Sequence, residues 1–250
     1  MIHYKLRHTS LSNESGFTII ESLVAILVVA ILLAAIAPVF VISVATRVQA
    51  KRIETATDAA KTYIDSLRSE ITIISTPTST PTPTPTPTLE KLVEPPDTVP
   101  DSVDDISNVD PPALGLSSCN SNKYCSPPNK KLYCMDFDGG GCTIDSNKDL
   151  IIQAFRYGGK VTTGGSTTNI TDPTKGYQLG LRVYRADGFA SAGGDLKKAP
   201  CKQLTFAGGL GDRKVPLIEM TTEITKGVSF RDFSTRLAEP YPTPTPKTCS

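Results

Sequence analysis

The feature that most constrains this chain is an apolar run from Phe17 to Ala45, in which Glu21 is the only charged residue. A helix of about 20 apolar residues spans the hydrocarbon core of a bilayer, so this run is long enough to cross it with some tilt. A secretory signal has a shorter apolar region, of about 7–15 residues, before its cleavage site. Lys5 and Arg7 precede the run, which predicts a cytoplasmic N-terminus and an exported C-terminal part.

A carboxylate inside an apolar run needs a specific partner, because a charge at bilayer depth costs a few kcal/mol or more. The nearest cations in the sequence are out of reach of Glu21 along a single helix. A cut between Gly16 and Phe17 would create a free amine one helical turn away, on the same helix or on that of a neighbouring subunit. A cut at the far end of the run, near residues 34–37, is an alternative that leaves Glu21 unexplained.

The helical pattern continues past the apolar run, with apolar residues recurring mostly at intervals of three or four. Pro38 lies inside the predicted helix and removes one backbone hydrogen bond, so we expect a kink or a local loss of helix there. A tract of alternating proline and threonine at 76–88 ends the helix, because such a tract favours extended polyproline II structure. The apolar positions of the amphipathic segment are Val48, Ile53, Ala56, Ala60, Tyr63, Ile64, Leu67, Ile71 and Ile74.

Three later segments, 150–157, 177–186 and 215–225, show the alternation of apolar and polar residues that is typical of half-buried strands. Glycine pairs separate several of these segments. The alternation predicts an antiparallel sheet with one covered face, and the amphipathic half of the helix is the obvious cover. The fold class is therefore α+β. The predicted inward positions are Tyr177, Leu179, Leu181, Val183, Ile218, Met220 and Ile224, with Gln178, Arg182, Tyr184, Glu219 and Glu223 on the opposite face.

Six cysteines all follow the apolar run, and an even number in a loop-rich exported domain predicts disulfides. A zinc site of four thiolates is the alternative, but the tight paired spacing of such sites is missing. The order along the chain favours local bridges among the first four cysteines and one bridge between the last two. The candidates are Cys119, Cys125, Cys134, Cys142, Cys201 and Cys249.

Composition argues against several classes of function. The net charge of +1 supplies no basic field for nucleic acid. Both histidines, His3 and His8, precede Gly16, so a chain cut there has no histidine for triad catalysis or metal ligation. We therefore expect no enzymatic activity and no resident cofactor, although carboxylate chemistry in a membrane-anchored enzyme is an alternative.

The stretch GFTIIESLVAILVVAILLAAIAP resembles the class III signal and N-terminal helix of type IV pilins and pseudopilins. The shared features are a short basic leader, Gly16 before the cut, Phe17 after it, Glu21 as the fifth mature residue, and Pro38. This resemblance covers the N-terminal fifth of the chain. It implies cleavage and N-methylation of Phe17 by a prepilin peptidase, docking of subunits through Glu21, and a filament of pilin-like subunits built on an inner-membrane platform.

A closer resemblance is to the pseudopilins of cyanobacterial hormogonium polysaccharide secretion. It rests on VATRVQAKRIETATDAAKTYID, FDGGGC, IIQAFR and GLRVYRADGF. This likeness implies a type IV pilus-like machine that exports polysaccharide during gliding motility. The alternatives are a type II secretion pseudopilin or a minor type IV pilin acting in protein export or adhesion.

Some pseudopilins bind calcium in a C-terminal loop, and the segment 136–150 is rich in oxygen ligands. It does not fit an EF-hand, because counting from Asp145 places Leu150 and Arg156 at the sixth and twelfth positions. The alternative is an acidic turn held between Cys134 and Cys142 without a metal. The calcium candidates are Asp136, Asp138, Asp145, Asn147 and Asp149.

These expectations combine into a single-pass protein of the inner membrane with a periplasmic C-terminal domain, incorporated into a filament or displayed at the cell surface. The expected fold is type IV pilin-like. The expected parts are a leader at 1–16, a transmembrane half-helix at 17–45, an amphipathic half-helix at 46–75, a Pro/Thr-rich and acidic linker at 76–113, and a disulfide-containing β-rich domain at 114–250.

Overall fold

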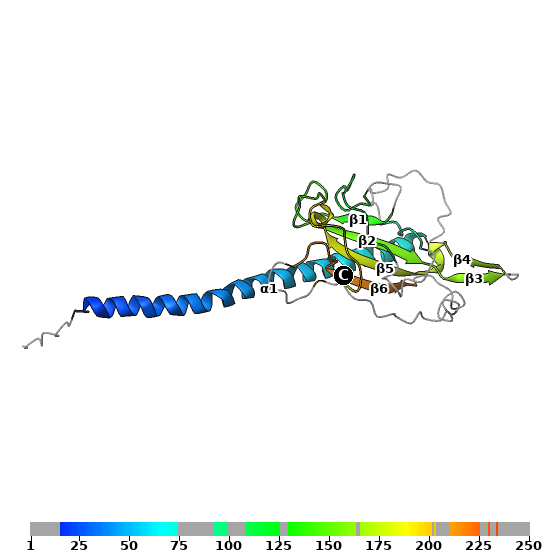
Figure 1. The fold of residues 1–250 in the computed structure, drawn as a ribbon. Coiled ribbons are helices and arrows are strands. Elements are labelled where there is room, and N and C mark those ends of the chain that lie inside the picture. Colours follow the sequence, from blue (N-terminus) through cyan, green and yellow to red (C-terminus); the bar gives the residue numbers. More distant parts are fainter. Residues whose placement is uncertain are drawn as a thin grey trace, which may run out of the picture. The chain divides into compact units, whose positions relative to one another are not determined.

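The computed structural model of the chain describes residues 16–74, 93–99, 109–125, 130–163, 166–201, 203, 211–225, 230 and 234. Residues 1–15 of the predicted leader, the Pro/Thr tract and Cys249 lie outside these described residues. The chain divides into two compact units, residues 1–45 and 46–250, and each is described by itself. Figure 1 shows the elements of both.

A single α-helix, α1 (Ile19–Ile74), contributes to both units and stays helical through Pro38. In the first unit its large apolar side chains are exposed along the whole length from Ile19 to Val44. Among the described residues, the segment Ile19–Ser69 contains the one stretch long and apolar enough to cross a membrane. A helix that is apolar on all faces is stable when lipid or other helices surround it.

In the second unit, α1 packs against a sheet through one narrow stripe. Ala59, Tyr63 and Leu67 lie four residues apart, which places them on one side of the helix. The alanines, Tyr63 and Leu67 share one core cluster with residues of β2 and β5. The Tyr63 hydroxyl lies 2.7 Å from that of Tyr124. The buried helix residues are Ala56, Ala59, Ala60, Tyr63, Ile64 and Leu67.

The sheet has four antiparallel strands in the order β1-β2-β5-β6. A separate two-stranded hairpin, β3-β4, extends from the unit (Figure 1). Short 3-10 helices, η2 and η3, precede and follow β5. The strands are β1 (Leu132–Met135), β2 (Leu150–Tyr157), β3 (Lys160–Thr163), β4 (Ser166–Asn169), β5 (Tyr177–Arg185) and β6 (Ile218–Ile224); the 3-10 helices are η2 (Pro173–Lys175) and η3 (Ala186–Phe189).

The predicted alternation is confirmed in β5 and β6, but the expectation that one face of the sheet alone is covered is wrong, because Ile151, Arg182 and Tyr184 are fully buried on the opposite face. One face of β5 joins the core under α1, through Tyr177, Leu179, Leu181 and Val183, and Ile224 of β6 joins the same core. On the opposite face, fully buried Arg182 donates through Nε to Glu219 at 2.8 Å and through Nη1 to Gln153 at 3.0 Å. A buried guanidinium is tolerated because these charge-assisted hydrogen bonds replace water.

The strand boundaries differ from the prediction at one end of the sheet. β6 begins at Ile218 rather than at residue 215, and Pro216 lies just before it. Proline has no N–H to donate to a ladder, which explains the later start. The edge strand β1 and the hairpin β3-β4 were not predicted, because four-residue strands carry too little alternation to be recognised.

Replacing Leu67 by alanine should lower the free energy of unfolding of the globular unit by about 2–5 kcal/mol, because it leaves a cavity between α1 and the sheet. The measurement is chemical denaturation of the full-length chain in mild detergent, followed by near-ultraviolet circular dichroism. The exposed Lys61→Ala change on the same helix is the control and should stay within about 0.5 kcal/mol of the wild type. Equal effects of the two changes would contradict this packing.

Candidate functional site

The predicted processing position lies just before the first turn of α1. Gly16, Phe17 and Thr18 are outside the helix. Thr18 caps it, because the backbone N–H of Glu21 donates to the Thr18 side-chain oxygen at 3.3 Å and the N–H of Ser22 donates to the Thr18 carbonyl at 3.1 Å. The Gly16–Phe17 peptide bond is therefore not engaged in helical hydrogen bonds, and Phe17 is exposed.

Glu21 occupies the third position of the helix, three residues after the capping threonine. This spacing is that of a capping box, in which an acid near the helix start is favoured by the helix dipole and by the free N–H groups. The Thr-x-x-Glu pattern of this cap is present in the sequence, in addition to the partner expected for Glu21, which was the Phe17 amine of the same helix or of a neighbouring subunit. Its side chain is exposed, and no ion pair of Glu21 occurs within the described part of the chain.

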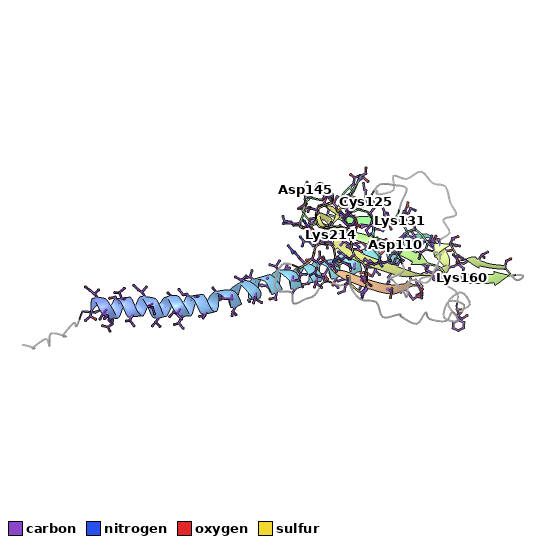
Figure 2. The ribbon with its side chains drawn as sticks, in the orientation of Figure 1. Asp110, Cys125, Lys131, Asp145, Lys160 and Lys214 are labelled. Atoms are coloured by element: carbon purple, nitrogen blue, oxygen red, sulfur yellow. A yellow bond between two sulfur atoms is a disulfide. The ribbon has the colours of Figure 1, made fainter. Side chains whose placement is uncertain are left out.

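The acidic loop between β1 and β2 brings together three of the five calcium candidates. One carboxylate oxygen from each of Asp136, Asp138 and Asp149 lies within 4.8 Å of the others. The carboxylate of Asp145 is not part of this group, and Asp145 and Asn147 are both exposed. Figure 2 shows Asp145 at the end of the globular unit opposite to Lys160 of β3.

Asp136 organises the loop through backbone hydrogen bonds. Its carboxylate accepts from the N–H groups of Gly141 at 2.8 Å, Gly139 at 2.7 Å and Asp138 at 3.1 Å. These donors, the Gly141 N–H above all, hold the pKa of Asp136 below its usual value. Gly141 has φ +90°, and a Cβ there would lie 2.5 Å from the carbonyl oxygen of Cys119, so the turn requires glycine.

The other two acids have partners of their own. Asp138 accepts from the Ser146 hydroxyl at 3.1 Å, and Asp149 accepts from the backbone N–H of Phe137 at 2.9 Å. Asp149 is fully buried, and its second oxygen has no hydrogen-bond partner among the described residues. The turn is thus largely satisfied by its own donors, and calcium binding by this loop stays a prediction.

Disulfides fix the base of this loop. Cys134 bonds Cys142 and closes it, and Cys119 bonds Cys125 in the preceding segment. The backbone N–H of Cys142 donates to the Cys119 carbonyl at 2.9 Å and so joins the two bridged segments. Local bridges among the first four cysteines were predicted, and these two are of that kind. Cys201 is also disulfide-bonded, and its predicted partner, Cys249, lies outside the described residues.

Comparison with known proteins identifies the N-terminal feature. The family model of the prokaryotic N-terminal methylation motif matches residues 11–37. No curated protein and no solved structure matches the chain. The matched range includes Gly16, Phe17 and Glu21. This match, together with a long apolar N-terminal helix and a four-stranded antiparallel sheet, supports a type IV pilin-like protein with an α+β pilin-type fold.

Replacing Asp136 by alanine should lower the melting temperature of the chain at pH 7, because three backbone donors lose their acceptor. The folded pKa of Asp136 lies below its unfolded value, so its stabilisation is present above about pH 4 and is lost as the pH falls through the folded pKa. The difference from wild type should shrink accordingly in melts recorded from pH 7 to pH 3.

The exposed Asp145→Ala change is the matched control for this loop, and it should leave the melting temperature unchanged at every pH. If the difference in melting temperature between Asp136→Ala and wild type does not shrink below the folded pKa of Asp136, the charge of its carboxylate does not stabilise the turn.

Proposed function

We propose that the chain is a pilin-like structural subunit, cut between Gly16 and Phe17 and assembled through α1. The observation that carries this proposal is the coincidence of the methylation motif with a helix that changes character along its length. Its first part exposes apolar side chains on every face, whereas the part after residue 46 buries a stripe on the sheet. Such a helix joins a membrane or a bundle of like helices to a separately folded unit.

Assembly in this proposal is a transfer of the exposed apolar segment from lipid to neighbouring copies. Packing of like helices in the filament replaces contacts with acyl chains, so the change in hydrophobic free energy is small and polar groups decide the register. Glu21 is the only acid of the segment. Pairing its carboxylate with the amine of Phe17 on a neighbouring subunit would remove an isolated charge from the apolar surroundings.

The cargo we propose is polysaccharide, exported by a type IV pilus-like machine on an inner-membrane platform during gliding. The support is the resemblance of particular stretches to the hormogonium pseudopilins. IIQAFR lies in β2 and GLRVYRADGF covers β5 and η3, both in the core, whereas FDGGGC forms the turn around Asp136. The residues of these stretches pack in the core or form the turn, so their resemblance supports a shared fold first and, through it, a shared cargo.

The Glu21→Ala variant tests the proposal. It should be inserted and cleaved normally but incorporated into filaments at least about tenfold less, because a paired charge worth about 1.4 kcal/mol corresponds to a factor of ten. The measurement is immunoblotting of sheared filament fractions from cells that carry the variant as the sole copy, beside the matched Ser22→Ala control. Normal incorporation of the variant would contradict a docking role for Glu21.

The same strain separates the two kinds of cargo. Surface polysaccharide should fall in parallel with filament incorporation, while proteins secreted into the medium stay at the wild-type level. Loss of secreted protein with unchanged polysaccharide would overturn the polysaccharide proposal and favour a role in protein export.

A further inference from the structure

The globular unit contains a pocket of about 510 Å³ between the first turns of α1 after residue 46 and the end of the acidic loop. None of the processing or assembly residues discussed above lines it, although the calcium candidate Asn147 does. The helix contributes Arg47, Val48, Lys51, Arg52 and Thr55; the rest of the unit contributes Phe137, Asn147, Lys148, Leu150, Arg185 and Leu217.

The pocket is strongly cationic. Five of its lining residues are arginine or lysine, and none is acidic. Arg47, Lys51 and Lys148 are exposed, and no salt bridge of theirs occurs within the described ranges. The pKa of Arg52 is lowered by burial and by the nearby charge of Arg185, as expected where cations gather.

Arg185 is largely buried, and its hydrogen-bond donors are not all satisfied. Its Nη2 pairs with Asp187, which lies outside the lining, but its buried Nε has no acceptor among the described residues. Asp187 neutralises one of the five charges, so the pocket and this neighbour together carry a net charge of +4 (five cations less one acid). A pocket of this kind favours an anionic ligand.

The floor of the pocket is apolar. Val48, Phe137, Leu150 and Leu217 face it, and Phe137 is 48% exposed, which is unusual for a phenylalanine side chain on a folded unit. A simple inorganic anion would leave this apolar surface uncovered. A ligand with an anionic head and an apolar body would satisfy both parts of the pocket.

The position of the pocket residues in the chain identifies the source of such a ligand. Arg47 follows the apolar run by two residues, and Lys51 and Arg52 come one turn later. When the apolar run spans a bilayer, the first turn beyond it lies at the depth of the lipid headgroups. A cation at this depth can pair with the phosphate of a headgroup, and the fork of arginine suits phosphate oxygens.

We propose that this pocket binds the phosphodiester headgroup of an anionic glycerophospholipid, with its glycerol and first acyl carbons against Phe137 and Val48. The inference rests on the membrane insertion contained in the proposed function. The bound lipid would hold the globular unit against the bilayer surface until the subunit leaves the membrane. A phosphate site without the apolar floor, or an acidic segment of a second copy, are the competing occupants that the test must distinguish.

The test uses the full-length chain in a neutral detergent, titrated with dihexanoyl phosphatidylglycerol and followed by thermal stabilisation and tyrosine fluorescence. Dihexanoyl phosphatidylcholine and inorganic phosphate are the two comparison ligands. The phosphatidylglycerol should bind, while phosphatidylcholine and inorganic phosphate bind at least tenfold more weakly. Equal binding of inorganic phosphate would assign the site to a simple anion and overturn the lipid proposal.

The informative variant combines Arg47→Gln, Lys51→Gln and Lys148→Gln, since these exposed side chains can change without loss of the fold. It should bind phosphatidylglycerol about tenfold more weakly, since each exposed ion pair contributes a factor of roughly 1.5–5 to the affinity. The matched control removes three exposed lysines elsewhere, through Lys61→Gln, Lys123→Gln and Lys175→Gln, and should bind as wild type. An equal loss in the control would show attraction to net charge alone.

Two further outcomes separate this inference from its alternatives. Protection of residues 47–55 from hydrogen exchange that rises with protein concentration, and not with phosphatidylglycerol, would assign the pocket to a second copy and overturn the lipid proposal. The Glu21→Ala variant should bind phosphatidylglycerol as the wild type does, because Glu21 does not line the pocket. A failure of lipid binding would therefore contradict the lipid proposal alone, and normal assembly of Glu21→Ala would contradict the docking role alone.

Discussion

The structure depends on one physical constraint, which is that α1 exposes apolar side chains on every face before residue 46. Each large aliphatic side chain left in water forgoes about 1.5–3 kcal/mol of burial free energy, so this segment requires lipid or other helices around it. The same constraint gives the acid at Glu21 its significance, because a charge is expensive in either setting unless it is paired. The methylation motif matches this region. The cleavage that we propose between Gly16 and Phe17 would create the amine with which Glu21 could pair.

Past residue 46 the helix serves a different purpose and obeys different packing rules. Its buried alanines, Tyr63 and Leu67 form a core with side chains of β2, β5 and β6. The opposite face of the sheet buries Arg182 with Glu219 and Gln153 and carries a second core that includes the disulfides. The unit therefore offers rigid surfaces at the end of β1 and β2, where the turn around Asp136 and the cationic pocket adjoin.

Much of the fold could be predicted from the sequence because its main elements have strong periodicity. The faces of β5 followed from the alternation of Tyr177, Leu179, Leu181 and Val183. Intervals of three and four predicted five of the buried helix positions, Ala56, Ala60, Tyr63, Ile64 and Leu67, but not Ala59, and they included Val48 and Ile53, which are only partly buried. The short strand β1 and the hairpin were missed, since so few residues give no reliable period. The sequence predicted a strand from residue 215, but β6 begins at Ile218. Pro216 has no backbone N–H to donate to the neighbouring strand, which delays the start of β6.

The candidate sites were harder to predict than the fold. Residue types in the acidic loop suggested five oxygen ligands, yet the backbone N–H groups of Gly139 and Gly141 bond Asp136, and the carboxylate of Asp145 lies outside the group of three acids. The cationic pocket could not be found in the sequence at all, because its lining comes from four separate segments, around residues 47–55, 137–150, 185 and 217. The helix cap at Thr18, by contrast, is predictable, because Thr18 and Glu21 have the spacing of a capping box.

The measurement that tests the central claim most directly is mass spectrometry of the N-terminus of the chain purified from its native cells. The account predicts a mature chain that begins at Phe17 and carries a methyl group on its amine, with the apolar segment retained. A chain that keeps Met1, or one cut at the far end of the apolar run near Ala37, would contradict it, because neither supplies the Phe17 amine that we propose as the partner of Glu21.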